Sequence, residues 1–116
     1  MTAPRPPLVA GNWKMNPTSS SEAVELARDV ADQTEGLPVR SVICPPSVYL
    51  EAVSEAVRDR EVEVGAQTMH AEESGAFTGE ISPVMLMPLV GYVIIGHSER
   101  RQYDNETDAA VAAKVR

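Results

Sequence analysis

Cysteine, long apolar runs and clustered basic residues are all scarce in this sequence of 116 residues. Cys44 is the single cysteine, which excludes an internal disulfide and a cysteine cluster that could bind zinc or iron. No apolar run approaches the length of a membrane span, and the N-terminal segment MTAPRPPLVAGNW lacks the apolar stretch of a signal peptide. We therefore expect a cytoplasmic protein with no membrane partner.

The charged residues also exclude a class of partner. The formal net charge is −7, the acidic residues are spread along the chain, and Lys and Arg form no stripe. We therefore expect no nucleic-acid partner. With 43% hydrophobic and 23% charged residues, the composition is typical of a soluble chain, and residues 1–116 are long enough for one small domain with a single core.

Four short segments have the composition of β-strands. Two of them, at residues 42–44 and 93–95, are continuously apolar, which is typical of strands covered on both faces in a parallel sheet. The third alternates between apolar and polar residues. The four segments are PLVAGNW from Pro7, VRSVIC from Val39, EVEVGAQ from Glu61 and YVIIGH from Tyr92.

Helix signals lie after each of these segments. Ser19 and Glu22 form a capping box, and a helical face of alanine, leucine and valine then runs to Gly36. The other helices are expected to start near residue 47, at 82–83 with a stop before 88, and between 105 and 108. The expected buried faces are Ala23, Leu26, Ala27, Val30 and Ala31 in the first helix, and Leu50, Val53, Ala56 and Val57 in the second.

Alternating strands and helices predict an α/β fold of four βα units with a parallel sheet. The last helix runs into the final AAKVR without a glycine, asparagine or proline to end it. We therefore expect the chain to be cut off within a larger fold.

Polar side chains follow three of the predicted strands. Asn12 and Lys14 come after the first, Gln67 after the third, and His97 and Glu99 after the fourth. In folds made of βα units, functional groups gather beyond the carboxyl ends of the strands. These five residues are therefore the candidate site.

Each of these side chains also has a structural interpretation. Lys14 either binds an anion or extends its stem to reach solvent. His97 either donates an N–H to a substrate carbonyl or makes a structural hydrogen bond. Glu99 either holds Lys14 across the site or pairs locally with Arg100 or Arg101.

Several other residues are assigned no chemistry. His70 has no acidic or histidine partner at ligand spacing, so we predict a loop residue and no metal site. Trp13 and Met69 are expected to pack, and Cys44 to be a small core residue rather than a nucleophile. Phe77 lies in a glycine-flanked loop, where it either enters a pocket of a ligand or partner or folds back onto its own core.

Five motifs in order resemble one family, across nearly the whole chain. They are AGNWKMN, CPPSVYL, GAQ, GAFTGEIS and GHSERR, which are similar to segments of triosephosphate isomerase. The resemblance implies the first half of a (β/α)₈ barrel and the interconversion of dihydroxyacetone phosphate and D-glyceraldehyde 3-phosphate. It also implies a place in glycolysis and gluconeogenesis, no cofactor, and a cytoplasmic homodimer.

The resemblance also implies a role for each matching residue. Asn12 and Lys14 would contact the triose phosphate, with Lys14 countering the charge of the phosphate and the enediolate. His97 would be the neutral electrophile that polarises the carbonyl and shuttles protons, and Glu99 would hold Lys14. These residues make up the expected substrate-binding and catalytic set.

A further set is implied for a dimer interface. Thr78 would enter the neighbouring subunit and steady the lysine and asparagine there. Phe77 in the same loop and Gln67 near it complete the expected interface.

Three departures from the family pattern qualify the resemblance. Thr68 stands where asparagine is common, and Asp104 stands where an aromatic residue is typical, so Asp104 needs either exposure or a partner. The third is length, because a barrel of this type needs about 250 residues. The catalytic glutamate, the lid and the glycine-rich phosphate loops of the family would lie in the missing half.

We therefore predict an isolated chain without activity, which a complementary C-terminal half would activate. The alternative is a self-associating half-barrel without catalysis, in which two copies pair their open edges. A flavodoxin-like receiver domain is disfavoured, because the acidic cluster such domains carry after the first strand is absent.

Overall fold

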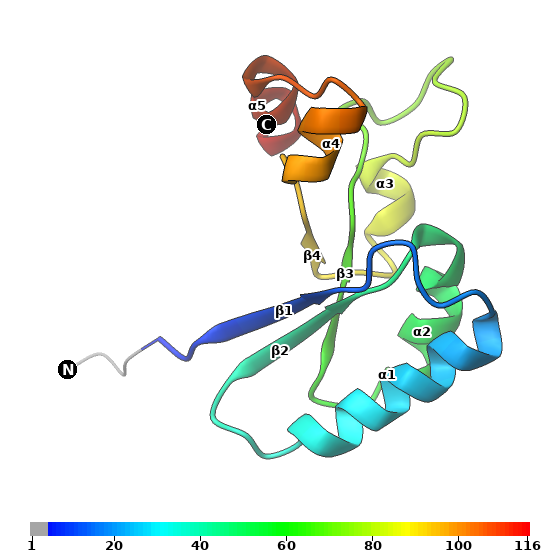
Figure 1. The fold of residues 1–116 in the computed structure, drawn as a ribbon, viewed down its shortest axis with the longest axis vertical. Coiled ribbons are helices and arrows are strands. Elements are labelled where there is room, and N and C mark those ends of the chain that lie inside the picture. Colours follow the sequence, from blue (N-terminus) through cyan, green and yellow to red (C-terminus); the bar gives the residue numbers. More distant parts are fainter. Residues whose placement is uncertain (1–4) are drawn as a thin grey trace.

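A computed structural model describes residues 5–116, so the first four residues of the N-terminal segment lie outside the described part. Over this range it contains four strands in one parallel sheet with the order β1-β2-β3-β4 (Figure 1). The predicted α/β fold of four βα units is confirmed. The strands are β1 (Leu8–Asn12), β2 (Arg40–Cys44), β3 (Glu63–Ala66) and β4 (Tyr92–Val93).

The helices between the strands begin where the capping residues predict. The side chains of Ser19, Ser82 and Thr107 each accept a backbone N–H in the first turn of the helix that follows. A six-residue helix between the fourth strand and the last helix was not predicted, since it is too short to show apolar periodicity. The helices are α1 (Ser20–Thr34), the 3₁₀ helix η1 (Ser47–Tyr49), α2 (Leu50–Ala56), α3 (Pro83–Leu86), α4 (Ser98–Tyr103) and α5 (Asp108–Val115).

The core lies between the sheet and the helices α1 and α2, which cover one side of it (Figure 1). The alanines of α1 are 0–3% exposed, and Leu50, Val53 and Val57 are equally enclosed, as predicted. Because alanine side chains are small, α1 can lie close to the sheet. Leu26 is 39% exposed, so its predicted burial was wrong, because it lies at the rim of the alanine stripe rather than on it.

The two outer strands are open to solvent. In β1, Leu8 and Val9 are 50% and 57% exposed, and residues 93–95 are only half-buried. The prediction that the fourth segment is covered on both faces was therefore wrong, and its regular strand is only two residues long. The reason is that β1 and β4 each have a single neighbouring strand in the described sheet.

The whole chain is correspondingly less compact than a closed domain. Its radius of gyration is 15.0 Å, whereas a compact domain of this length has about 13 Å. Figure 1 shows a curled sheet. Helices α4 and α5 lie at the top of this view, and the loop before α3 lies to their right. The sheet and its helices form half of a barrel.

The inner face of the sheet is packed closely around a glycine. A Cβ atom at Gly65 would lie 2.9 Å from Cys44 Sγ and 3.2 Å from Val42 Cγ1. Nearer the amino ends of the strands, Arg40 and Tyr92 both contact the carboxylate of Glu63, at 3.0 and 3.3 Å. The inner face therefore has a small-residue layer with a polar layer beside it.

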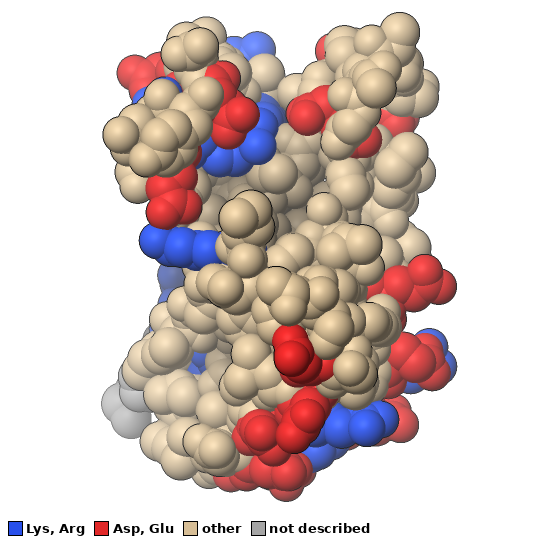
Figure 2. Space-filling model, turned by 45° about the vertical axis from the view of Figure 1, so that its right-hand side comes forward, with Lys and Arg blue, Asp and Glu red and all other residues tan. Residues whose placement is uncertain are grey.

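The surface carries both signs of charge. On the face shown in Figure 2, basic and acidic residues are interspersed, and a hollow separates two lobes at one end of the molecule. None of the helices within residues 5–116 combines the length and apolarity that crossing a membrane requires.

Candidate functional site

A pocket of about 570 Å³ lies beyond the carboxyl ends of the strands. It contains all five predicted site residues, although they come from three separate segments of the chain. The parallel direction of the strands explains this, because the loops after β1, β3 and β4 leave the sheet at the same edge. The lining residues are Asn12, Lys14, Met15, Asn16, Pro46, Ser47, Gln67, Thr68, His97, Glu99, Arg100, Tyr103 and Asp104.

Lys14 and Glu99 form an ion pair across this pocket. Lys14 Nζ lies 2.8 Å from Glu99 Oε1, although the residues are 85 positions apart in the sequence. The hydrogen bond from Lys14 lowers the pKa of Glu99. Of the two interpretations of Glu99, the structure therefore favours the one in which it holds Lys14, since Arg100 and Arg101 pair with other carboxylates.

His97 caps the amino end of α4. Its Nδ1 accepts the backbone N–H of Glu99 at 3.1 Å, so a neutral ring carries its proton on Nε2. The Glu99 carboxylate is 3.7 Å from the same Nδ1 and would form an ion pair only with a protonated ring. The backbone contact is the shorter of the two, so it determines which nitrogen carries the proton, and Nε2–H remains available as a donor.

Two side-chain amides shape the loop that carries Lys14. Asn12 Oδ1 accepts the backbone N–H of Lys14 at 2.9 Å. Gln67 Nε2 donates to the backbone carbonyls of Lys14 and Cys44, at 2.7 and 2.9 Å. The predicted role of Gln67 at a dimer interface stays a prediction, but within the chain it already joins two loops.

Glu106, which sequence reasoning missed, lies beside the pocket with 4% of its side chain exposed. One carboxylate oxygen accepts the backbone N–H of Gly96 at 3.1 Å. The other accepts hydrogen bonds from Arg100 Nε at 3.0 Å and Lys114 Nζ at 2.9 Å, and Lys114 also contacts Thr68. Glu106 thereby fixes the turn before His97 to α4 and α5.

The groups around Glu106 offset the effect of burial on its pKa. Burial alone would raise the pKa of this carboxyl, but hydrogen bonds from Lys114, Arg100 and the backbone of Gly96 lower it to about 2. No local pattern announces this cluster, because its members lie in separate elements. No spacing in the sequence would have identified Glu106.

Both substituted positions of the family pattern are accommodated. Asp104 is exposed and lies 3.7 Å from Arg100, so its carboxylate is neither desolvated nor isolated. Thr68 accepts a hydrogen bond from Lys114 at 3.3 Å. Neither residue leaves an unsatisfied group in the pocket wall.

The loop before α3 closes on itself. The rings of His70 and Phe77 lie 4.1 Å apart between centroids, and His70 Nδ1 accepts the backbone N–H of Glu72. Phe77 thus folds back onto its loop rather than the core, and it remains 44% exposed. Thr78 is also exposed. His70 is a loop residue as predicted, while the interface roles of Phe77 and Thr78 stay predictions.

The remaining predictions concern packing. Trp13 and Met69 pack against the core cluster, as predicted. Cys44 is 1% exposed, and burial raises the pKa of its thiol, so it is a core residue as predicted rather than a nucleophile.

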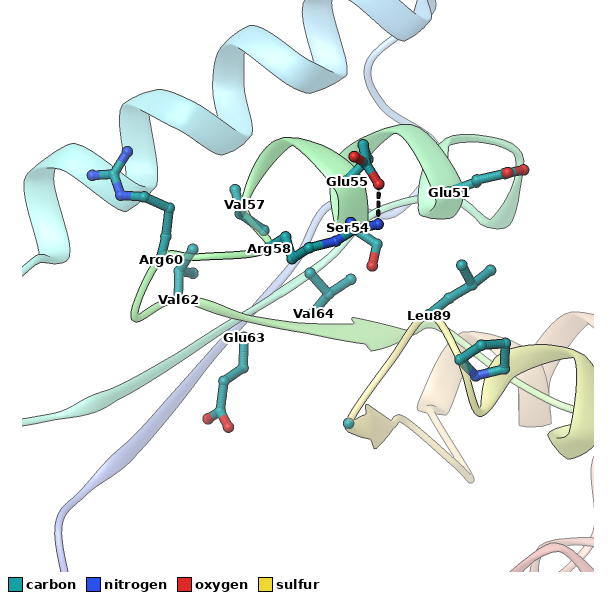
Figure 3. A pocket seen from close by; sticks show the side chains of 12 residues that line it. Glu51, Ser54, Glu55, Val57, Arg58, Arg60, Val62, Glu63, Val64 and Leu89 are labelled. Carbon is teal, nitrogen blue, oxygen red and sulfur yellow. Dashed lines mark hydrogen bonds and ion pairs between the residues drawn. The ribbon is translucent and has the colours of Figure 1, made fainter.

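A second hollow, of about 440 Å³, lies between α2 and the amino ends of β3 and β4 (Figure 3). Its wall includes Glu51, Ser54 and Leu89, and most of its charged residues are already engaged with one another or with neighbours at the surface. These ion pairs are Arg58 with Glu55, Arg60 with Asp32 and Glu35, and Glu63 with Arg40. Within residues 5–116, no group of three or more His, Cys, Asp or Glu side chains is placed to hold a metal.

Known proteins are similar to this chain in sequence and in fold. A triosephosphate isomerase from Clostridium botulinum (strain Loch Maree / Type A3) is 56% identical over 113 residues, which is 97% of this chain and 45% of that protein. One from Clostridium perfringens (strain SM101 / Type A) is 50% identical over the same shares. The crystal structure of triosephosphate isomerase from Bartonella henselae matches with a TM-score of 0.88 and 38% identity, over 96% of this chain and 46% of that chain.

The chain therefore spans about half the length of the relatives that it matches. The model of the family described as triosephosphate isomerase matches residues 7–116, which include every residue of the pocket. The half-barrel, the pocket at its carboxyl edge and these matches show that the chain belongs to the triosephosphate isomerase family.

Proposed function

We propose that these residues form the substrate-binding half of an isomerase site that interconverts dihydroxyacetone phosphate and D-glyceraldehyde 3-phosphate. The observation that carries the proposal is the ion pair of Lys14 and Glu99 beside the Nε2 donor of His97 in one pocket. The reaction moves protons between neighbouring carbons and oxygens of the substrate. It therefore requires no cofactor, and it belongs to glycolysis and gluconeogenesis.

In this proposal each side chain has a distinct task. The ammonium of Lys14 attracts the phosphate dianion and offsets the negative charge that develops on the enediolate. Asn12 shapes the loop of Lys14 and contacts the substrate. His97 donates its Nε2 proton towards a substrate oxygen and shuttles protons between the two oxygens, while Glu99 orients Lys14.

The same pocket has no obvious acceptor for the proton that must leave carbon. Its carboxylates are Glu99 and Asp104, and each lies beside a cation, Lys14 and Arg100 respectively. The hydrogen bond from Lys14 lowers the pKa of Glu99 and makes it a weaker base, and Asp104 is exposed to solvent. We propose that residues 1–116 alone do not turn over substrate, and that a complementary C-terminal half supplies the base.

A coupled isomerase assay tests this proposal. The chain alone should give no turnover above the uncatalysed rate. Addition of the C-terminal part of the Clostridium botulinum relative, beyond its matched region, should produce turnover. Activity of the isolated chain would contradict the division of the site, and an inactive mixture that light scattering shows to be assembled would contradict the proposed reaction.

We propose that the protein is a homodimer in the cytoplasm, with the loop of residues 71–80 at the interface. Phe77 and Thr78 in this loop are exposed, and Val84 and Met85 on the following helix α3 are also exposed. Exposed apolar side chains such as Phe77, Val84 and Met85 are available to a protein interface. Gln67 would lie behind this interface, as the clamp of the Lys14 loop.

A non-catalytic function has a separate observation in its favour. The open β1 edge exposes Leu8 and Val9, so two copies could pair their edges into a self-associating half-barrel. Light scattering combined with NMR separates the two functions. A monomer with dispersed, native-like NMR signals would contradict the self-associating half-barrel, whereas a dimer that persists in the Val9→Lys variant would show that this edge is not the contact.

A further inference from the structure

Lys14 has a backbone conformation that its own side chain does not favour. Its φ angle is +56°, in the left-handed region that non-glycine residues seldom adopt because Cβ approaches the following carbonyl oxygen. A relaxed backbone would carry Nζ to a different place, since the side chain leaves the chain in a direction set by φ. Something in the structure must therefore stabilise the observed conformation.

Gln67 is well placed to do so. It follows the last residue of β3, Ala66, which is 1% exposed, so the amide projects from a rigid point. Its Nε2 donates to Lys14 O at 2.7 Å and to Cys44 O at 2.9 Å. Cys44 O also accepts the backbone N–H of Trp13 at 3.1 Å. One amide nitrogen thus ties the loop after β1 to the end of β2.

The chemistry of this contact requires an amide on a side chain of this length. An NH₂ group offers two donors to two carbonyl oxygens, whereas a carboxylate offers none and would repel both. Asparagine is shorter by one methylene, and methionine has the right length without donors. Position 67 therefore demands glutamine for a reason that lies within this chain.

We propose that Gln67 is a positioning residue, which holds Lys14 in its left-handed backbone conformation and thereby sets Lys14 Nζ on Glu99. The proposal rests on the proposed function of Lys14 as the cation of the site. It adds an intrachain role to a residue that the family resemblance placed near a dimer interface. Gln67 acts through Lys14 and does not itself touch the reacting atoms.

NMR of the 116-residue chain tests the proposal without any substrate. The chain has two lysines, Lys14 and Lys114, whose ammonium protons become visible when an ion pair slows their exchange. In Gln67→Met the ammonium signal of Lys14 should be lost, and its three-bond amide-to-Hα coupling should change as φ relaxes. The signal of Lys114 should persist, which makes it an internal control for the fold.

A matched control and a second measurement complete the test. Gln33→Met, an exposed change on α1, should leave both lysine signals unchanged. A folded Gln67→Met chain with an unaltered Lys14 signal and coupling would overturn the proposal. If that variant does not fold, the unmodified chain decides, because its Gln67 Nε2 protons should exchange more slowly than those of Gln33, and equal rates would overturn it.

The outcome is separable from that of the isomerase proposal. The lysine signals report the geometry of Lys14 whether or not any substrate binds. A silent isomerase assay with a positive NMR result would reject the reaction and keep the role of Gln67. The reverse pair of results would keep the reaction and reject that role.

Discussion

Glu106 ties together the turn before His97, although it lies outside the pocket lining. Three donors, from Gly96, Arg100 and Lys114, converge on a carboxylate that is nearly enclosed. A buried charge of this kind stabilises a protein only while all its partners remain. The effect of removing it is therefore predictable.

Stability should depend on pH through Glu106. Its pKa of about 2 in the folded chain is below the ordinary value of 4.5, so its contribution is complete above about pH 4.5 and is lost as the pH falls towards 2. We predict that Glu106→Gln lowers the free energy of unfolding by about 3 kcal/mol at pH 7 and by much less at pH 3. Urea unfolding at both pH values measures this.

The control for that experiment is Glu25→Gln, an exposed change on α1. It should alter the free energy of unfolding by less than about 0.5 kcal/mol at either pH. An equal loss for Glu106→Gln at pH 7 and pH 3 would show that the charge of Glu106 is not what stabilises the turn.

Unlike Glu106, Glu99 should matter little for stability and strongly for activity. Its ion pair with Lys14 is largely exposed, so Glu99→Gln should change the unfolding midpoint little. In the complemented enzyme the same variant should lower kcat/KM by about 100-fold, because a misplaced Lys14 meets the substrate poorly. A large loss of stability with unchanged kcat/KM would contradict this assignment.

At the residue scale, the sequence predicted the members of the site better than their connections. Lys14, His97 and Glu99 were predictable because parallel strands deliver their carboxyl ends to one edge. Glu106 and the amide clamp of Gln67 were not, because each depends on how loops pack after the sheet has formed. The spacing of residues along the chain does not predict such contacts.

At the scale of elements, the close approach of β2 and β3 depends on Gly65. A Cβ there would lie 2.9 Å from Cys44 Sγ, so Gly65→Ala should destabilise the chain by about 1–3 kcal/mol. Gly91→Ala is the matched control, since its Cβ would meet nothing within 4 Å. Thermal unfolding of the two variants measures the difference in stability. Equal unfolding midpoints would contradict tight packing around Gly65.

The elements themselves were largely predictable, and the exceptions have physical causes. Capping residues located the starts of α1 and α3, because each cap supplies a local hydrogen bond, and α5 begins within the range predicted for the last helix. The exposure of β1 and β4 was not predictable, since apolar strand sequences do not reveal whether a neighbour is present. The short helix α4 was not predicted because its polar sequence has no apolar face.

At the scale of the whole molecule, the open half-barrel explains why several apolar residues are exposed. The sheet has helices on one side and two free edges, and the chain spans about half the length of its relatives. The pocket at its carboxyl edge has a cation and a proton donor, but its carboxylates are paired with cations. Under the proposed function, a partner that completes the barrel would also supply the base that this pocket needs.

The most direct test of this account compares two charge-removing variants in the complemented isomerase assay. Lys14→Met removes the proposed cation of the site, and Arg28→Met removes an exposed cation from α1. We predict that Lys14→Met lowers kcat/KM at least about 100-fold, while Arg28→Met retains the activity of the unmodified chain. Equal activity of the two variants, in mixtures assembled to the same extent, would contradict the central claim that Lys14 is the cation of a triosephosphate isomerase site.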